Sequence, residues 1–219
     1  VAHALHAVAR TPVISLPAVT EETFGATGVD TRSRQIIDGM LASYNRMNPV
    51  NLSLITSIRT LIDPAALVAP AATPLADIAP PPPVSPFALP APVNLSEMDD
   101  ALRAVVLQLS AAIPSPGTQV IPTLYRHLAI WPQFLMHLAP ALLAAMQRGE
   151  VEARMNDLIS AMAPLTQSVT ARARARNLGT PPLGDLHAML KTLDAFLYTI
   201  PQLVVVGTAL RASIPVYEA

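Results

Sequence analysis

The feature of this sequence that most restricts its fold is a similarity between two segments that lie 152 positions apart. The first covers residues 41–62 (LASYNRMNPVNLSLITSIRTLI) and the second covers residues 193–214 (LDAFLYTIPQLVVVGTALRASI). When they are aligned without a gap, five of the twenty-two positions are identical. Each segment also contains an aromatic residue, a proline five residues later and an arginine near the end of an apolar stretch. This shared order predicts that the chain contains two copies of one helical unit.

The spacing of apolar residues predicts an all-α fold. Over residues 32–48, apolar side chains recur at intervals of three and four, which is typical of an amphipathic helix. Similar spacing recurs in other segments, and no segment has the alternation of a β-strand. Because the residue before a proline avoids helical angles, we expect this helix to end at Asn48 and a second helix to begin at Val50. Further helices are expected over residues 121–143, in two pieces separated at Trp131-Pro132, and over 150–165, 166–178 and 185–212.

Composition excludes several classes of site and partner. The chain is 52% hydrophobic and 13% charged, which supplies enough apolar material for a core. It has no cysteine, so disulfides, thiolate zinc sites and cysteine nucleophiles are excluded. The net charge of −1 gives no overall attraction for nucleic acid or anionic lipid, and the basic run RARAR at residues 172–176 is expected to be a solvated helix face. We therefore expect a cytoplasmic protein with neither nucleic acid nor membrane as a partner.

Two segments approach the length and polarity of membrane-spanning helices. They cover residues 127–146 and 195–210, and each lacks Asp, Glu, Lys and Arg. Both are barely long enough to span a bilayer, and both contain proline. Buried core helices are therefore the favoured interpretation.

A proline-rich stretch divides the chain. Residues 63–94 contain ten prolines and almost no charge, which predicts an extended linker that packs along the body of the protein. The expected organisation is a partial first helical repeat over 1–62, this linker, and a second helical repeat over 95–219. A docking site for a proline-recognition domain is the less favoured alternative, because no basic residue flanks the run of four prolines.

The segments YNRMNPVNLSLIT (residues 44–56) and LYRHLAIWPQFL (residues 124–135) resemble the group I haloacid dehalogenases, all-α enzymes that hydrolyse 2-haloalkanoic acids. The resemblance covers most of the chain. It implies two pseudo-symmetric helical repeats joined by a proline-rich linker. The first repeat is expected to be truncated, because it contains no counterpart of LYRHLAIWP. The implied reaction is attack by water with inversion, assisted by a general base and needing no metal or cofactor.

The same resemblance implies a set of pocket residues. It places substrate-binding roles on Asn48, Asn51, Pro122, Thr123 and Tyr198, for a halogenated or hydroxy carboxylic acid. It places the catalytic aspartate at Leu124, and leucine cannot accept a proton. No Asp or Glu lies between Asp100 and Glu150, and a shift of one residue would substitute Thr123 or Tyr125.

Three interpretations of function follow. In the first, the chain is a 2-haloacid dehalogenase whose activity is lost or uses another base. In the second, it is a non-catalytic helical scaffold that binds a small carboxylic acid or a protein partner. In the third, a second copy of the chain completes the first repeat in a homodimer.

Individual candidates also have structural interpretations. Asn48 can satisfy backbone groups at a helix end, and Tyr198 can pack with its hydroxyl tethered. Arg126 can bind a carboxylate or make a structural contact at a helix end. His3 and His6 are too few to hold a metal ion, so no metal site is expected.

Overall fold

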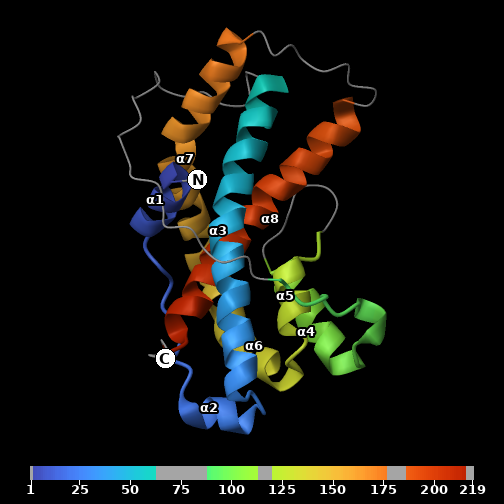
Figure 1. Ribbon diagram of the computed structural model, residues 1–219. Helices are drawn as coiled ribbons and strands as arrows, with labels where there is room; N and C mark the ends of the chain where they lie inside the picture. The colour runs from blue at the N-terminus through green and yellow to red at the C-terminus, as the bar shows by residue number, and fades with distance from the viewer. Residues whose placement is uncertain (1, 63–87, 113–119, 177–185, 216–219) are drawn as a thin grey trace.

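The computed structural model describes residues 2–62, 88–112, 120–176 and 186–215. Within these ranges the chain forms helices and loops, and no residue lies in a β-strand, which confirms the all-α prediction (Figure 1). Most of the predicted linker lies outside the described residues, and its last part, residues 88–94, is irregular. The elements in chain order are α1 (Ala2–Arg10), α2 (Glu21–Ala26), α3 (Thr31–Ile62), the short 3₁₀ helix η2 (Leu95–Glu97), α4 (Asp100–Ala111), α5 (Thr123–Leu128), α6 (Pro132–Gln147), α7 (Glu150–Ala175) and α8 (Leu186–Ser213).

Helix α3 runs without interruption through Pro49, so the predicted helix end at Asn48 is wrong. A proline inside a helix removes one backbone hydrogen bond and costs about 3 kcal/mol. Here Asn48, Pro49 and Leu52 are all buried, and packing of this face compensates for the lost bond. Helix α7 likewise continues through Pro164, where two helices were predicted, whereas the predicted separation at Trp131-Pro132 is confirmed.

Helices α3 and α8 form the most extensive helix pair of the fold and run antiparallel (Figure 1). An ion pair closes each end of this pair. Arg59 Nε lies 2.8 Å from Asp194 Oδ1, and Arg211 Nε lies 2.9 Å from Asp38 Oδ1. Helices α1 and α7 pack beside the pair on one side, and α5 lies on the other (Figure 1).

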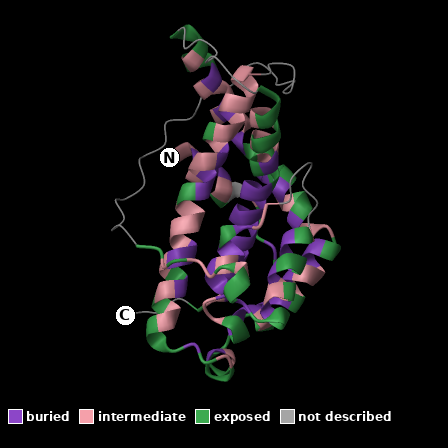
Figure 2. Ribbon diagram, turned by 90° about the vertical axis from the view of Figure 1, so that its right-hand side faces the viewer, coloured by how far each residue is buried: buried purple, intermediate pink, exposed green. Residues whose placement is uncertain are grey.

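Two apolar clusters support this arrangement. The larger joins the start of α3 to α4, α5, α6 and the end of α8, with Phe24 of α2 beneath them. The smaller joins α1, α7 and the middle of α3 and α8. Buried positions lie on the inner helix faces and exposed positions on the outer faces (Figure 2). The space between α3, α5 and α8 is therefore bounded by well-packed elements.

Within the described parts of the chain, one helix, α8, is long and apolar enough to cross a membrane by length and composition alone. Within the most apolar 18-residue stretch of this helix, 67% is buried inside the protein. Its burial against α3 and α7 agrees with the predicted role as a core helix.

Candidate functional site

A cavity of about 370 Å³ lies between α3, α5 and α8. Its volume is within the range of pockets that hold small molecules. Among the described residues that line it, none is Asp, Glu, Lys or Arg. The lining residues are Ser43, Tyr44, Met47, Asn48, Asn51, Leu89, Val120, Ile121, Pro122, Thr123, His127, Phe196, Thr199, Ile200 and Leu203.

Helices α3 and α8 each present one face to the cavity, because their lining residues recur at intervals of three and four. Four pairs of these residues are separated by the same 152 positions that separate the two similar segments. The two helices therefore contribute matching positions but different side chains. The pairs are Tyr44 with Phe196, Met47 with Thr199, Asn48 with Ile200, and Asn51 with Leu203.

Asn48 is the most informative polar residue of the cavity. The residue is only 8% exposed, and its amide nitrogen Nδ2 has no hydrogen-bond partner. A buried donor without a partner costs about 1–3 kcal/mol. The Nδ2 atom itself has almost no exposed surface, so an acceptor on a ligand reaches it once the Asn48 side chain turns toward the cavity.

Tyr44 and His127 form a hydrogen-bonded pair in the same cavity. The His127 Nε2 atom lies 2.8 Å from the Pro90 carbonyl oxygen, and Nδ1 lies 2.7 Å from the Tyr44 hydroxyl. A carbonyl can only accept, so Nε2 carries the proton. In the neutral ring Nδ1 is then an acceptor, and the Tyr44 hydroxyl donates to it.

Burial keeps both members of this pair uncharged at neutral pH. Burial lowers the pKa of His127, and the nearby Arg126 adds to this effect, while the hydrogen bond to Pro90 opposes it. Burial also raises the pKa of Tyr44 to about 12, although Arg126 acts in the opposite direction. The described residues of the lining are therefore neutral, and among them His127 is the one that a small change could ionise near physiological pH.

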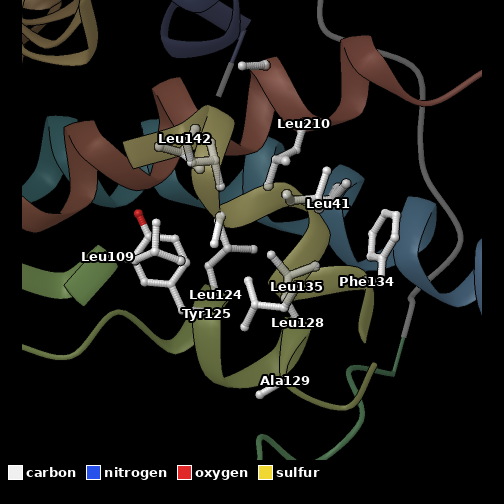
Figure 3. Packing of buried hydrophobic residues seen from close by; sticks show 14 of the residues in the cluster. Leu41, Leu109, Leu124, Tyr125, Leu128, Ala129, Phe134, Leu135, Leu142 and Leu210 are labelled. Carbon is white, nitrogen blue, oxygen red and sulfur yellow. The ribbon is translucent and has the colours of Figure 1, made fainter. Parts of the chain in front are cut away.

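The start of α5 places Thr123 at the cavity and Leu124 in the core. Thr123 is exposed and lines the cavity, whereas Leu124 has no exposed surface and packs with Leu109 and Leu128 (Figure 3). Successive helical residues point about 100° apart, so adjacent side chains reach different environments. Position 124, where the resemblance places the catalytic aspartate, therefore does not face the cavity, and position 123 does.

The structure brings four of the five predicted substrate-binding residues together. Asn48, Asn51, Pro122 and Thr123 line the cavity. Tyr198 is not among the lining residues and is 43% exposed. Its neighbours on α8 explain this placement, because the lining face contains positions 196, 199, 200 and 203 and position 198 falls on another face.

Arg126 makes structural contacts. Its Nε donates to the Val93 carbonyl over 3.0 Å, and its terminal nitrogen donates to the Asn94 side-chain oxygen over 3.0 Å. The Val93 amide in turn donates to the Arg126 carbonyl. These bonds fix the segment that carries Pro90 beside α5, and so they hold the acceptor for His127 in place.

Tyr44 and His127 are not among the pocket residues predicted from the sequence. Tyr44 is the aromatic residue of the first of the two similar segments, and 83 positions separate it from His127. A histidine in the apolar segment 124–135 was the one available indication. Within the described residues, no three His, Asp or Glu side chains are placed to hold a metal ion.

Comparisons with known proteins identify no relative. No family model, no curated protein and no solved structure matches this chain. The chemistry of the cavity has to follow from its own residues.

Proposed function

We propose that the cavity between α3, α5 and α8 binds a small carboxylic acid that carries a halogen or a hydroxyl group on carbon 2. The observation that carries this proposal is the unpartnered Nδ2 donor of Asn48, a buried residue that lines a cavity of about 370 Å³. Asn51 adds a second amide on the same helix face. A carboxylate or hydroxyl oxygen of the ligand would satisfy a donor that the protein leaves unpaired.

The opposite side of the cavity suits the carbon chain of such an acid. Phe196, Ile200 and Leu203 are apolar, and the Thr199 hydroxyl donates to the Ala195 carbonyl of its own helix over 2.9 Å. This side therefore offers contact with alkyl carbon and halogen, while recognition of oxygen falls to α3. An apolar lining with a few placed polar groups is typical of small-molecule sites.

Binding without hydrolysis is the function that this geometry supports best. A dehalogenase needs a base to activate water, and the part of the lining that the structure describes includes no carboxylate. Hydrolysis of 2-haloalkanoic acids with inversion is the second candidate. It is favoured because the two segments that resemble the dehalogenases both reach this cavity, the first through Asn48 and Asn51 and the second through His127.

We also propose that α3 and α8 are equivalent helices of two repeats, a partial one within residues 1–62 and a second within residues 95–219. Support comes from the four matched pairs of cavity residues and from the ion pairs at both ends of the helix pair. The matched arginines of the two segments, Arg59 and Arg211, each bind an aspartate of the opposite helix. The two aspartates are not at matched positions, because Asp194 corresponds to residue 42, about one helical turn from Asp38. A two-fold relation between repeats would produce such approximately reciprocal contacts.

The binding proposal is tested by titrating the protein with lactate and with 2-chloropropionate, using calorimetry and thermal unfolding. We expect millimolar or tighter binding, and we expect Asn48→Leu to weaken it by about tenfold or more, because a hydrogen bond to a charged group contributes about 1.5–3 kcal/mol. The control is Asn156→Leu, which makes the same change at an exposed position of α7. Absence of binding by either acid would overturn the proposal.

Hydrolysis is tested separately by halide release from 2-chloropropionate. Thr123→Asp places a carboxylate at the cavity and is expected to create or increase halide release. Leu124→Asp places the same group in the core, where an unpaired charge is expected to unfold the protein. If the wild type and Thr123→Asp both bind the acid but release no halide, the dehalogenase candidate fails and the binding function stands.

A further inference from the structure

When no charged ligand occupies the cavity, the hydrogen bond between Tyr44 and His127 has a fixed direction. The Pro90 carbonyl requires a proton on Nε2, so Nδ1 takes the proton of the Tyr44 hydroxyl. The Tyr44 oxygen then offers only lone pairs to anything else in the cavity. In this state the pair repels a carboxylate, although both residues line the space where the ligand would lie.

We propose that the Tyr44–His127 pair recognises the ligand carboxylate and that binding loads one proton onto His127. This inference rests on the proposed binding of a carboxylic acid. One proton passes from solvent to Nδ1, and no other covalent bond changes. Nδ1–H then donates to the Tyr44 oxygen, and the released Tyr44 O–H donates to a carboxylate oxygen. The Nε2–H bond to Pro90 is unchanged in both states.

The surroundings of His127 favour such a coupling. From α5, Arg126 disfavours a positive charge on the ring, and the Pro90 carbonyl of the segment before η2 favours it. From α3 the ring meets the neutral hydroxyl of Tyr44, and α8 contributes only uncharged side chains to the cavity. A carboxylate arriving in this space is therefore the missing opposite charge, and it favours the protonated ring.

The direction of the pH dependence follows. Without ligand the pKa of His127 lies below its usual value, because burial disfavours the charged ring. With ligand the opposite charge and the Tyr44 bond raise the pKa. Between these two values the complex binds one proton more than the free protein, so affinity rises as the pH falls. Above the pKa of His127 in the complex, the affinity for the acid is low and constant. Below the pKa of His127 in the free protein, this affinity is high and constant.

Calorimetric titration with 2-chloropropionate at several pH values between about 5 and about 8 tests the proposal. Titrations in two buffers of different ionisation enthalpy give the number of protons taken up. We expect up to one proton per ligand and, in the coupled range, close to a tenfold change in Kd per pH unit. The uncharged analogue 2-chloropropionamide should bind without proton uptake.

Two matched variants separate His127 from other histidines. His127→Gln keeps a donor for the Pro90 carbonyl and removes Nδ1, so we expect no proton uptake and a Kd that does not depend on pH. His137→Gln changes an exposed histidine of α6 and should behave as the wild type. Tyr44→Phe removes the donor and should weaken binding of the acid more than binding of the amide.

Different results would overturn the role of His127 and the proposed binding of the acid. Binding of 2-chloropropionate by the wild type with no proton uptake and a constant Kd overturns the role of His127 and leaves the binding function intact. No binding at any pH overturns both. If His127→Gln does not fold, the NMR titration of the His127 ring in the wild type decides, because ligand must raise its pKa and an unchanged pKa contradicts the proposal.

Discussion

The two long walls of the cavity differ in chemistry although they share their geometry. Helix α3 contributes Tyr44, Asn48 and Asn51, whereas the positions 152 residues later on α8 carry Phe196, Ile200 and Leu203. Each wall presents the same pattern of helix positions. The backbone arrangement thus sets where side chains meet, and the side chains alone decide which wall binds oxygen and which binds carbon. One helical framework can therefore form a cavity with one polar wall and one apolar wall.

The matched residues Asn48 and Ile200 show the difference most sharply. They are 8% and 6% exposed, so they lie at almost the same depth. Ile200 also packs in the smaller apolar cluster with Leu52 and Val204, while Asn48 leaves its amide nitrogen unpaired. Ile200 therefore stabilises the fold, whereas Asn48 lowers its stability and leaves a binding group free.

The largest effect is expected when the apolar wall is made polar. Ile200→Asn should lower the free energy of unfolding by about 3 kcal/mol, because it removes apolar packing and buries an amide. Chemical denaturation measures this loss. Ile200→Val is the control and should cost about 1 kcal/mol. Equal losses for the two variants would show that this wall does not depend on apolar packing.

The reverse exchange should act in the opposite direction on stability. Asn48→Leu removes the unpaired buried donor and is expected to raise the free energy of unfolding by about 1–2 kcal/mol. The same variant should bind 2-chloropropionate more weakly. Thermal unfolding with and without the acid measures both effects. A variant that lost stability would show that the Asn48 amide already has a partner in the free protein.

The close approach of the two helices can be tested at Gly207. A Cβ atom at Gly207 would lie 2.6 Å from Asn45 Oδ1, so Gly207→Ala forces the Asn45 side chain to move. We expect a net loss of about 1 kcal/mol, since the gain in helix propensity offsets part of the strain. Adding Asn45→Ala should remove the loss, as measured by chemical denaturation. If the single variant is as stable as the double one, the helices are not in tight contact there.

The smallest effects are expected at the two ion pairs. Arg59 and Asp194 are 15% and 38% exposed, whereas Arg211 and Asp38 are 47% and 52% exposed. Double-mutant cycles should give about 1 kcal/mol for the first pair and only about 0.3 kcal/mol for the second, because water screens the second pair more. Added salt should reduce both values. A stronger coupling for the more exposed pair would contradict this ranking.

Much of the framework could be predicted because it depends on local patterns. Apolar spacing of three and four predicted helices and no strands, and the structure confirms that class over the described residues. The Trp131-Pro132 separation was also predicted correctly, since proline is well suited to the first position of a helix. Asn48, Asn51, Pro122 and Thr123 were assigned by resemblance, and they do lie together at one cavity.

The features that could not be predicted depend on contacts between distant residues. Packing carries α3 through Pro49, which local rules treat as a helix end. A difference of one residue separates the cavity position Thr123 from the core position Leu124, and only the orientation of α5 decides between them. The pairing of Tyr44 with His127 depends on how α3 meets α5, which no spacing in the sequence encodes.

The ion pairs of α3 and α8 join residues 135 and 173 positions apart. During synthesis at about 5–20 residues per second, α8 therefore follows α3 by roughly 8–30 s. Throughout that interval the face of α3 that α8 will cover has no partner, and the cavity has only one of its two long walls. The contact between α3 and α8 can form only after both helices have been made, and apolar surface that is exposed until then favours aggregation.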